Sequence, residues 1–236
     1  MMSVPASQTC ISAVNGAAIA AMQQGKYAHS TMALKRALAV LKASLNADNA
    51  NEFATSAVKP EDQGLLWSVA CANPDTTAAI VGSSNNFEVF QSAFHLPDDR
   101  WCSANKTRAS VIILYNMGLS YHLSGLSRGS SKELSMARDL YKMALTIVET
   151  SLAQVHTDRL LLLQLLALFN NLGHIHSYCY EESDTKQCMT AIKALLASRA
   201  YYHAKCEDAT EAFAFFEWST LSITSPENIF TFAPAA

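Results

Sequence analysis

The sequence predicts an all-α fold built from antiparallel helix pairs. Apolar residues recur at helical spacing in several segments, and turns or capping residues divide these segments into consecutive pairs. Of the 236 residues, 50% are hydrophobic and only 16% are charged, whereas an average soluble domain has about 25% charged residues. Such a chain has a substantial core, which excludes intrinsically disordered and low-complexity proteins.

The first helix pair is expected within residues 1–45. Residues 13–23 are rich in small side chains, residues 24–26 (Gln-Gly-Lys) predict a turn, and residues 27–45 form a second helix. One apolar stripe follows that helix, at Leu34, Ala37, Leu38, Leu41 and Leu45. Lys26, Lys35, Arg36 and Lys42 give the pair a basic face, which we interpret as solvated rather than as a surface for RNA or an acidic partner.

Residues 46–104 are expected to form an irregular insert, because Asn, Asp, Ser, Gly and Pro are scattered through them. Pro60 favours the start of a short helix that continues through Cys71, since Pro suits a first helical turn. Residues 77–81 and 87–95 favour strands, and the Gly-Ser-Ser-Asn-Asn sequence between them predicts a small β-hairpin.

Two further helix pairs are expected at residues 105–149 and 159–203. The second pair has its loop at residues 125–129, and Ser130 with Glu133 predicts a capping box at the start of its second helix. In the third pair, Asp184 with Gln187 gives a similar capping signal.

The C-terminal part, residues 207–236, predicts one more amphipathic helix and a tail. Phe213 and Phe216 lie on one face of that helix, which we expect to cover the open end of the helical array. The helices around Leu114 and Leu165 are almost without charge, so we expect them to be buried on most sides.

A motif recurs in the second and third pairs. Tyr115-Asn116-Met117-Gly118 is followed by Tyr121, and Asn170-Asn171-Leu172-Gly173 is followed by His176. Together with Ala137, Tyr141, Cys188 and Ile192 downstream, these segments resemble degenerate tetratricopeptide repeats. The order of motifs and the terminal Ala-Pro-Ala-Ala also look like a group of uncharacterised algal repeat proteins. The resemblance implies a single domain over residues 1–236, a right-handed superhelix whose first helices line a concave groove.

The resemblance also implies which residues bind a partner in that groove. In tetratricopeptide proteins an Asn at the position of Asn116 and Asn171 often holds the backbone of a bound peptide, because its amide both donates and accepts. The same register places six more residues on the groove face: Tyr115, Leu119, His122, Asn170, His174 and Tyr178. The alternative is that the two asparagines bridge neighbouring helices of the fold.

We therefore expect a non-catalytic scaffold that binds a protein or a peptide and needs no cofactor or metal. The sequence has no nucleophile elbow, phosphate-binding loop or dinucleotide fingerprint, so an enzyme is not expected. His174 and His176 lie about 200° apart on a helix, and His176 with Cys179 supplies only two ligands for a metal. A small metal-binding or hydrolytic protein using these residues is one alternative, and a self-associating structural subunit is another.

Charge and hydropathy bear on the remaining partners and on the compartment. The net charge of −3 gives no general attraction to nucleic acid. The longest apolar stretch, residues 160–169, is half as long as the roughly 20 residues that span a bilayer, so no transmembrane helix is expected. The N-terminus lacks a secretory pattern, which favours an intracellular, cytoplasmic protein whose six cysteines are small buried side chains. The absence of acidic residues before Asp48 leaves organelle import as an alternative.

Overall fold

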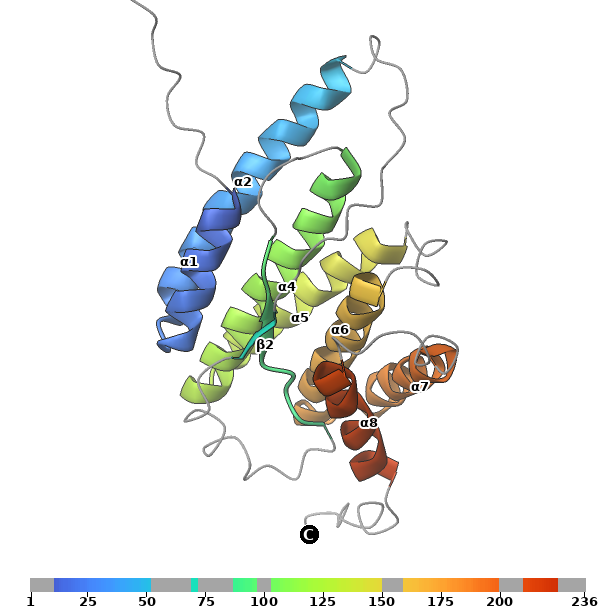
Figure 1. The fold of residues 1–236 in the computed structure, drawn as a ribbon. Helices are drawn as coiled ribbons and strands as arrows, with labels where there is room; N and C mark the ends of the chain where they lie inside the picture. The colour runs from blue at the N-terminus through green and yellow to red at the C-terminus, as the bar shows by residue number, and fades with distance from the viewer. Residues whose placement is uncertain are drawn as a thin grey trace, which may run out of the picture. The chain divides into compact units, whose positions relative to one another are not determined.

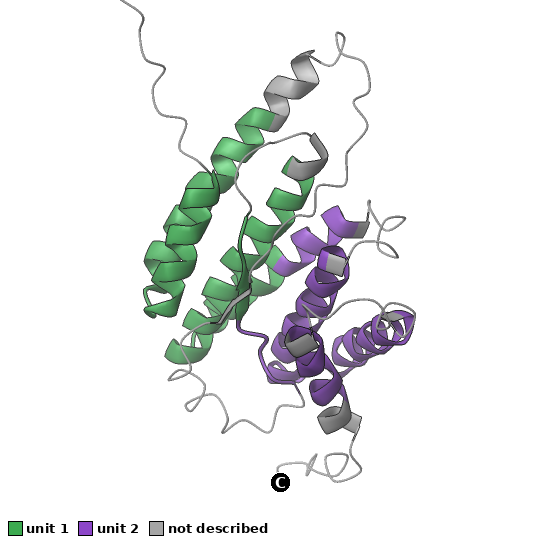
Figure 2. Cartoon of the chain, viewed as in Figure 1, with its two compact units in different colours: residues 1–77, 92–140 green, residues 78–91, 141–236 purple. Residues whose placement is uncertain are grey.

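The computed structural model describes residues 11–51, 69–71, 87–96, 103–149, 159–199 and 210–224. These residues are mostly helical and include two three-residue strands, so the prediction of an all-α fold is confirmed with a small β element added. The chain divides into two compact units (Figure 2). The first consists of residues 1–77 and 92–140, and the second of residues 78–91 and 141–236.

The first unit contains the helices α1 (Ile11–Gln23), α2 (Tyr27–Asn51) and α4 (Ser103–Arg128), which lie side by side (Figure 1). The predicted turn between α1 and α2 is confirmed at Gly25, which has a φ of 70°. The predicted stripe on α2 is buried at Leu34, Ala37 and Leu41. The helix is longer than expected, because it continues past Leu45 to Asn51.

The helix α5 (Ser131–Glu149) begins in the first unit and continues into the second at Tyr141. The loop predicted at residues 125–129 is wrong, because α4 extends to Arg128 and the chain turns at Gly129, where φ is 62°. Gly125 lies within α4 and leaves room for the start of α5, because an added Cβ would be 2.9 Å from Leu134 Cδ2. Half of the predicted capping box is present, with the Glu133 N–H donating to Ser130 Oγ at 3.3 Å. The reciprocal bond is not made, because the Ser130 N–H donates to the Gly125 carbonyl at 2.8 Å.

Gly125 and Gly16 provide a matched pair of helix glycines for a stability test. A Cβ at position 125 also meets the backbone nitrogen of Leu134 at 3.1 Å, whereas a Cβ at position 16 meets nothing within 4 Å. We expect Gly125→Ala to lower the free energy of unfolding by about 1–3 kcal/mol. Gly16→Ala is expected to raise it by about 0.5–1 kcal/mol, because Ala is the better helix former. Urea denaturation measures both values, and a Gly125→Ala protein as stable as the wild type would contradict the close packing.

The strands β1 (Val69–Cys71) and β2 (Ser92–Phe94) pair in antiparallel fashion, with Val69 opposite Phe94. The short helix predicted to reach Cys71 is therefore wrong at its described end, and its remainder lies outside the described residues. The strand partner of residues 92–94 is β1, whereas the partner predicted for the hairpin, residues 77–81, lies outside the described residues. β2 also packs against α4 (Figure 1).

The second unit contains α6 (Arg159–Tyr178), α7 (Glu182–Arg199) and α8 (Thr210–Thr224), which pack against one another. The capping pair predicted at Asp184 and Gln187 is displaced, because α7 begins at Glu182 and Asp184 lies within its first turn. A first turn favours acidic residues as a cap position does, so the two placements look alike in the sequence.

Burial in the second unit agrees with part of the sequence prediction. Phe213 and Phe216 of α8 are buried as expected, whereas Trp218 is 71% exposed. Cys188 is buried, but Cys179 is exposed, so the prediction that the cysteines are buried is wrong for Cys179. Cys179 follows the last residue of α6, which explains its exposure.

The two weakly charged helices are buried over long stretches. In the first unit every residue from 109 to 120 of α4 is buried, and in the second unit every residue from 160 to 168 of α6 is buried. An ordinary surface helix has one solvated side. The expectation that these helices are covered on most sides is therefore confirmed.

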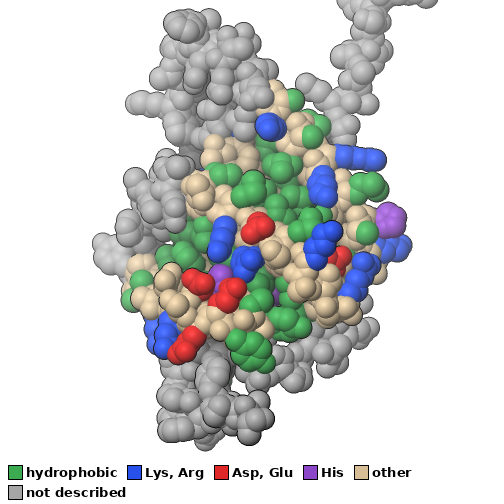
Figure 3. Space-filling model, turned by 180° about the vertical axis from the view of Figure 1, so that it is seen from behind, with side chains coloured by type: hydrophobic (Ala, Val, Ile, Leu, Met, Phe, Trp, Pro, Cys, Tyr) green, Lys and Arg blue, Asp and Glu red, His purple; other side chains and the backbone are tan. Residues whose placement is uncertain are grey.

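The surface of the described residues carries charges of both signs. Lys26, Lys35, Arg36 and Lys42 are all exposed, and Lys35 Nζ lies 5.5 Å from the centroid of the Tyr121 ring. On the face drawn in Figure 3, basic and acidic side chains both occur among polar and apolar atoms. Among the helices that the structure describes, none has the length and apolar character needed to cross a membrane.

Candidate functional site

Part of the insert lies against α4 in the first unit and against α6 in the second (Figure 1). We call this segment, residues 87–96, the strap. Residues 92–96 of the strap belong to the first unit and residues 87–91 to the second. Six of its ten residues are buried, namely Phe87, Val89, Phe90, Ala93, Phe94 and Leu96. The strap therefore contributes to the core of each unit, and its contacts are described one unit at a time.

In the first unit, Asn116 of α4 binds both backbone polar groups of one strap residue. Asn116 Oδ1 accepts a hydrogen bond from the Phe94 N–H at 3.0 Å, and Asn116 Nδ2 donates to the Phe94 carbonyl at 2.7 Å. Asn15 of α1 donates to the same carbonyl at 3.0 Å and accepts from Asn116 Nδ2 at 2.9 Å. A carboxamide can do this because it offers a donor and an acceptor side by side, as a neighbouring strand does. We call the binding of one residue's N–H and carbonyl by a single Asn side chain an asparagine clamp.

Other groups of the first unit hold the strap on both sides of the Asn116 clamp. The Tyr115 hydroxyl donates to the Ser92 carbonyl at 3.1 Å, and Ser12 Oγ donates to the Leu96 carbonyl at 2.9 Å. The rings of Tyr115 and Phe94 are in edge contact, with their centroids 4.8 Å apart. The carbonyls of every second residue from 92 to 96 are thus bound by side chains, as expected for an extended segment.

In the second unit, Asn171 of α6 makes the same clamp. Asn171 Oδ1 accepts from the Phe90 N–H at 2.8 Å, and Asn171 Nδ2 donates to the Phe90 carbonyl at 3.1 Å. Asn171 Nδ2 also lies 3.3 Å from the Tyr141 hydroxyl. Burial raises the pKa of Tyr141 although this hydrogen bond opposes the effect, so the phenol stays neutral.

Asn170 and Gly173 extend the strap contacts in the second unit. Asn170 Nδ2 donates to the Glu88 carbonyl at 2.7 Å, while its Oδ1 accepts from Ser219 Oγ at 3.3 Å. An added Cβ at Gly173 would be 2.6 Å from the Phe87 ring. The glycine of the recurring motif thus makes room for a strap side chain in this unit.

The structure places the predicted partner-binding residues in three different environments. Tyr115, Asn116, Asn170 and Asn171 contact the strap. Leu119, His122 and His174 are buried within their units, and Tyr178 is 39% exposed. Burial lowers the pKa of His174 to about 4, so its imidazole is neutral at pH 7.

Sequence reasoning missed Asn15, Ser12 and the strap as parts of the site. The sequence does contain a signal for Asn15, because this polar residue stands among the small apolar residues of α1. In the structure it is fully buried. The sequence predicted a strand over residues 87–95, and the structure has one at residues 92–94. Nothing local in the sequence indicated that asparagines 22 and 81 residues away would bind them.

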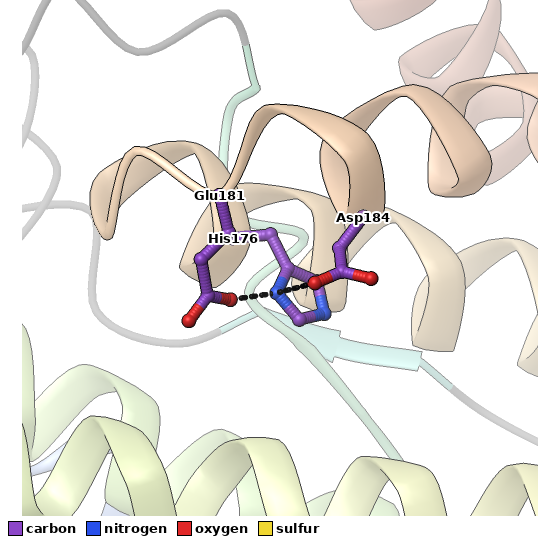
Figure 4. A group of neighbouring side chains, drawn as sticks. All are labelled: His176, Glu181 and Asp184. Carbon is purple, nitrogen blue, oxygen red and sulfur yellow. Dashed lines mark hydrogen bonds and ion pairs between the residues drawn. The ribbon is translucent and has the colours of Figure 1, made fainter.

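A second cluster of polar side chains lies where α6 ends and α7 begins, at His176, Glu181 and Asp184 (Figure 4). His176 Nδ1 contacts the Glu181 carboxylate and lies 3.9 Å from Asp184 Oδ2. The side chains are 4%, 35% and 51% exposed, respectively. One imidazole and two carboxylates are suitable ligands for a divalent cation.

Each member of this cluster also has a structural role. The contact between His176 and Glu181 joins the last turn of α6 to the turn that follows, where Tyr180 has a φ of 59°. Asp184 lies in the first turn of α7, where the helix dipole favours a carboxylate. Glu181 and Asp184 surround His176, whereas the sequence had suggested Cys179 as its neighbour.

Comparisons of the chain with protein-family models, with curated proteins and with solved structures gave no match. The resemblance to tetratricopeptide repeats therefore rests on the sequence motifs. The two asparagine clamps, which bind backbone N–H and carbonyl groups, are the structural feature that bears most directly on function.

Proposed function

We propose that this protein is a non-catalytic interaction module that binds an extended segment of a partner protein along the first helices of its helix pairs. The asparagine clamp supports this proposal. In each unit one carboxamide binds the N–H and the carbonyl of a single strap residue. Such contacts recognise a peptide backbone whatever its side chains are, which suits the binding of a peptide.

The proposal includes a tetratricopeptide-like arrangement of the helix pairs. Both clamp residues stand two positions before the glycine of the recurring motif, Asn116 before Gly118 and Asn171 before Gly173. Asn116 and Asn171 therefore occupy the same position of the motif, and each makes the same hydrogen bonds to the strap within its own unit. This agreement supports an internal repeat in which the first helix of a pair faces the bound segment.

In each unit the strap occupies the clamp, so a partner segment has to displace it there. A tethered segment competes at an effective concentration in the millimolar range when its linkers are short and flexible. Binding from solution is weakened by the fraction of molecules in which the strap is bound. The proposed module is therefore one whose affinity depends on how firmly its own strap is held.

The test uses the full-length protein and a fluorescein-labelled synthetic peptide with the sequence of residues 87–96. Fluorescence anisotropy is followed up to millimolar protein, where we expect a saturable isotherm. N-methylation of the peptide nitrogen that corresponds to Phe90 is expected to weaken binding by at least about tenfold. The added peptide alone then loses its hydrogen bond to Asn171 Oδ1, whereas the strap keeps the same contact.

The matched control is the same peptide with Glu88→Gln, which alters an exposed side chain. It is expected to leave the isotherm unchanged. The absence of saturable binding, or equal affinities of the N-methylated and the unaltered peptide, would contradict the proposed function.

A further inference from the structure

Three side chains that can bind a cation meet at the junction of α6 and α7 in the second unit. His176 lies in the last turn of α6, Glu181 directly precedes α7, and Asp184 lies in the first turn of α7. One ligand atom of each, an imidazole nitrogen or a carboxylate oxygen, lies within 4.8 Å of the other two. All three residues belong to the second unit, so the cluster is formed within one compact body.

The imidazole of His176 is enclosed by protein and directed at the two carboxylates. Its side chain is 4% exposed, and its Nδ1 contacts Glu181 and lies 3.9 Å from Asp184 Oδ2 (Figure 4). The basic residue nearest to the cluster in the sequence, Lys186, pairs with Glu182 at the exposed surface. A proton on His176 balances one of the two carboxylate charges, whereas a divalent cation bound to the neutral imidazole balances both.

Backbone hydrogen bonds fix the turn that carries the three side chains. The Glu181 N–H donates to the His176 carbonyl at 2.9 Å, which joins two of the candidate ligand residues directly. The Thr185 N–H and the Thr185 hydroxyl both donate to the Glu181 carbonyl, at 3.0 Å and 2.8 Å. Ligands that stand on such a frame lose little conformational freedom when they bind an ion.

The donor atoms and their spacing suit Zn²⁺ better than Ca²⁺ or Mg²⁺. Zn²⁺ binds imidazole nitrogen and carboxylate oxygen at about 2.0–2.2 Å, so ligand atoms in a tetrahedral site lie about 3.3–3.6 Å apart. The 3.9 Å between His176 Nδ1 and Asp184 Oδ2 is close to this spacing, and rotation of the partly exposed carboxylates adjusts it. Ca²⁺ and Mg²⁺ prefer sites made of oxygen alone. Three protein ligands leave the fourth position of the ion to water.

We propose that His176, Glu181 and Asp184 bind one divalent transition-metal ion of the Zn²⁺ class, which joins the end of α6 to the start of α7. The ion takes the place of the proton between His176 Nδ1 and the Glu181 carboxylate, and that proton goes to solvent. The three ligands are brought together by folding, so the bound ion stabilises the folded second unit. The site is independent of the proposed peptide binding, because the strap contacts of α6 lie at Asn170 and Asn171.

The test is isothermal titration calorimetry of Zn²⁺ into the full-length protein after dialysis against EDTA. We expect one site per chain with a Kd in the micromolar range. Asp184→Asn keeps the size of a half-exposed side chain and is expected to weaken binding by at least about tenfold, since loss of a group that merely supports a ligand already costs about 10–100-fold. His176→Gln is expected to weaken it further. Circular dichroism establishes folding, and Asp184→Asn alone decides the test if His176→Gln unfolds.

Glu182→Gln is the matched control, because Glu182 lies in the same turn, is exposed and pairs with Lys186. This variant is expected to bind Zn²⁺ as the wild type does. Cys179→Ser is also expected to keep the wild-type affinity, although Cys179 is an exposed thiol three positions after His176. Thermal unfolding gives a second readout: Zn²⁺ is expected to raise the Tm of the wild type and of Glu182→Gln, but not that of Asp184→Asn.

Three results would overturn the proposal. The first is the absence of saturable Zn²⁺ binding, or equal affinities of the wild type and Asp184→Asn. The second is binding that is lost in Cys179→Ser and kept in Asp184→Asn, which would assign the ion to other ligands. The third is binding of Ca²⁺ or Mg²⁺ at least as tight as that of Zn²⁺, which would contradict the class of metal.

Discussion

Phe94→Ala is expected to lower the free energy of unfolding by about 3–5 kcal/mol, the usual cost of removing a buried Phe ring. Phe94 has 0% exposure, contacts the Tyr115 ring and lies opposite Val69 in the strand pair. The cost combines the lost burial with the cavity that remains. Because native proteins have only about 5–15 kcal/mol of stability, we expect an effect on the whole first unit.

Urea denaturation followed by circular dichroism measures this loss. The control is Met32→Ala on α2, which removes a side chain that is 49% exposed and is expected to change stability by no more than about 0.5 kcal/mol. A loss below about 1 kcal/mol for Phe94→Ala would show that the strap is not part of the core.

The protein is expected to lose about 3 kcal/mol of stability between pH 6.5 and pH 4 because of His174. Burial lowers the pKa of His174 from an ordinary value of 6.5 to about 4. Well above pH 6.5 the imidazole is neutral in the folded and in the unfolded protein, so its protonation costs no stability. Between the two values the unfolded chain binds a proton that the folded protein does not, and stability falls by up to about 1.4 kcal/mol per pH unit.

Urea denaturation at several pH values tests this expectation. His174→Gln removes the titrating group, so the variant is expected to have a shallower dependence on pH whatever its stability at pH 7. His29→Gln is the control, because His29 is exposed on α2 and its replacement is expected to keep the wild-type dependence. An unchanged slope in His174→Gln would mean that the imidazole is not buried in its neutral form.

The sequence predicted the helices well because their signals are local. The stripe at Leu34, Ala37 and Leu41 and the cap at Ser130 each depend on residues within a few positions. The loop at residues 125–129 was predicted incorrectly because Gly125 usually indicates a turn. In the structure this glycine lies within α4 and allows the close approach of Leu134, which no local pattern reports.

The β pairing and the strap depended on contacts that the sequence does not display. Val69 pairs with Phe94 across 24 intervening positions that carry their own turn signals, so the local pattern favoured a different hairpin. The motif singled out Asn116 and Asn171 as residues that bind the backbone of a partner peptide, and this stays a prediction. It could not indicate that the backbone they bind in this structure is that of residues 87–96.

The two clamps close chain loops of very different length, which has a consequence for the order of folding. Asn116 and Phe94 are 22 positions apart, whereas Asn171 and Phe90 are 81 positions apart. The longer loop costs about 1 kcal/mol more in chain entropy, since the cost rises with the logarithm of loop length. During synthesis, moreover, Phe90 leaves the ribosome well before α6 exists. We therefore expect residues 92–96 to dock first and residues 87–91 to stay accessible until the second unit is complete.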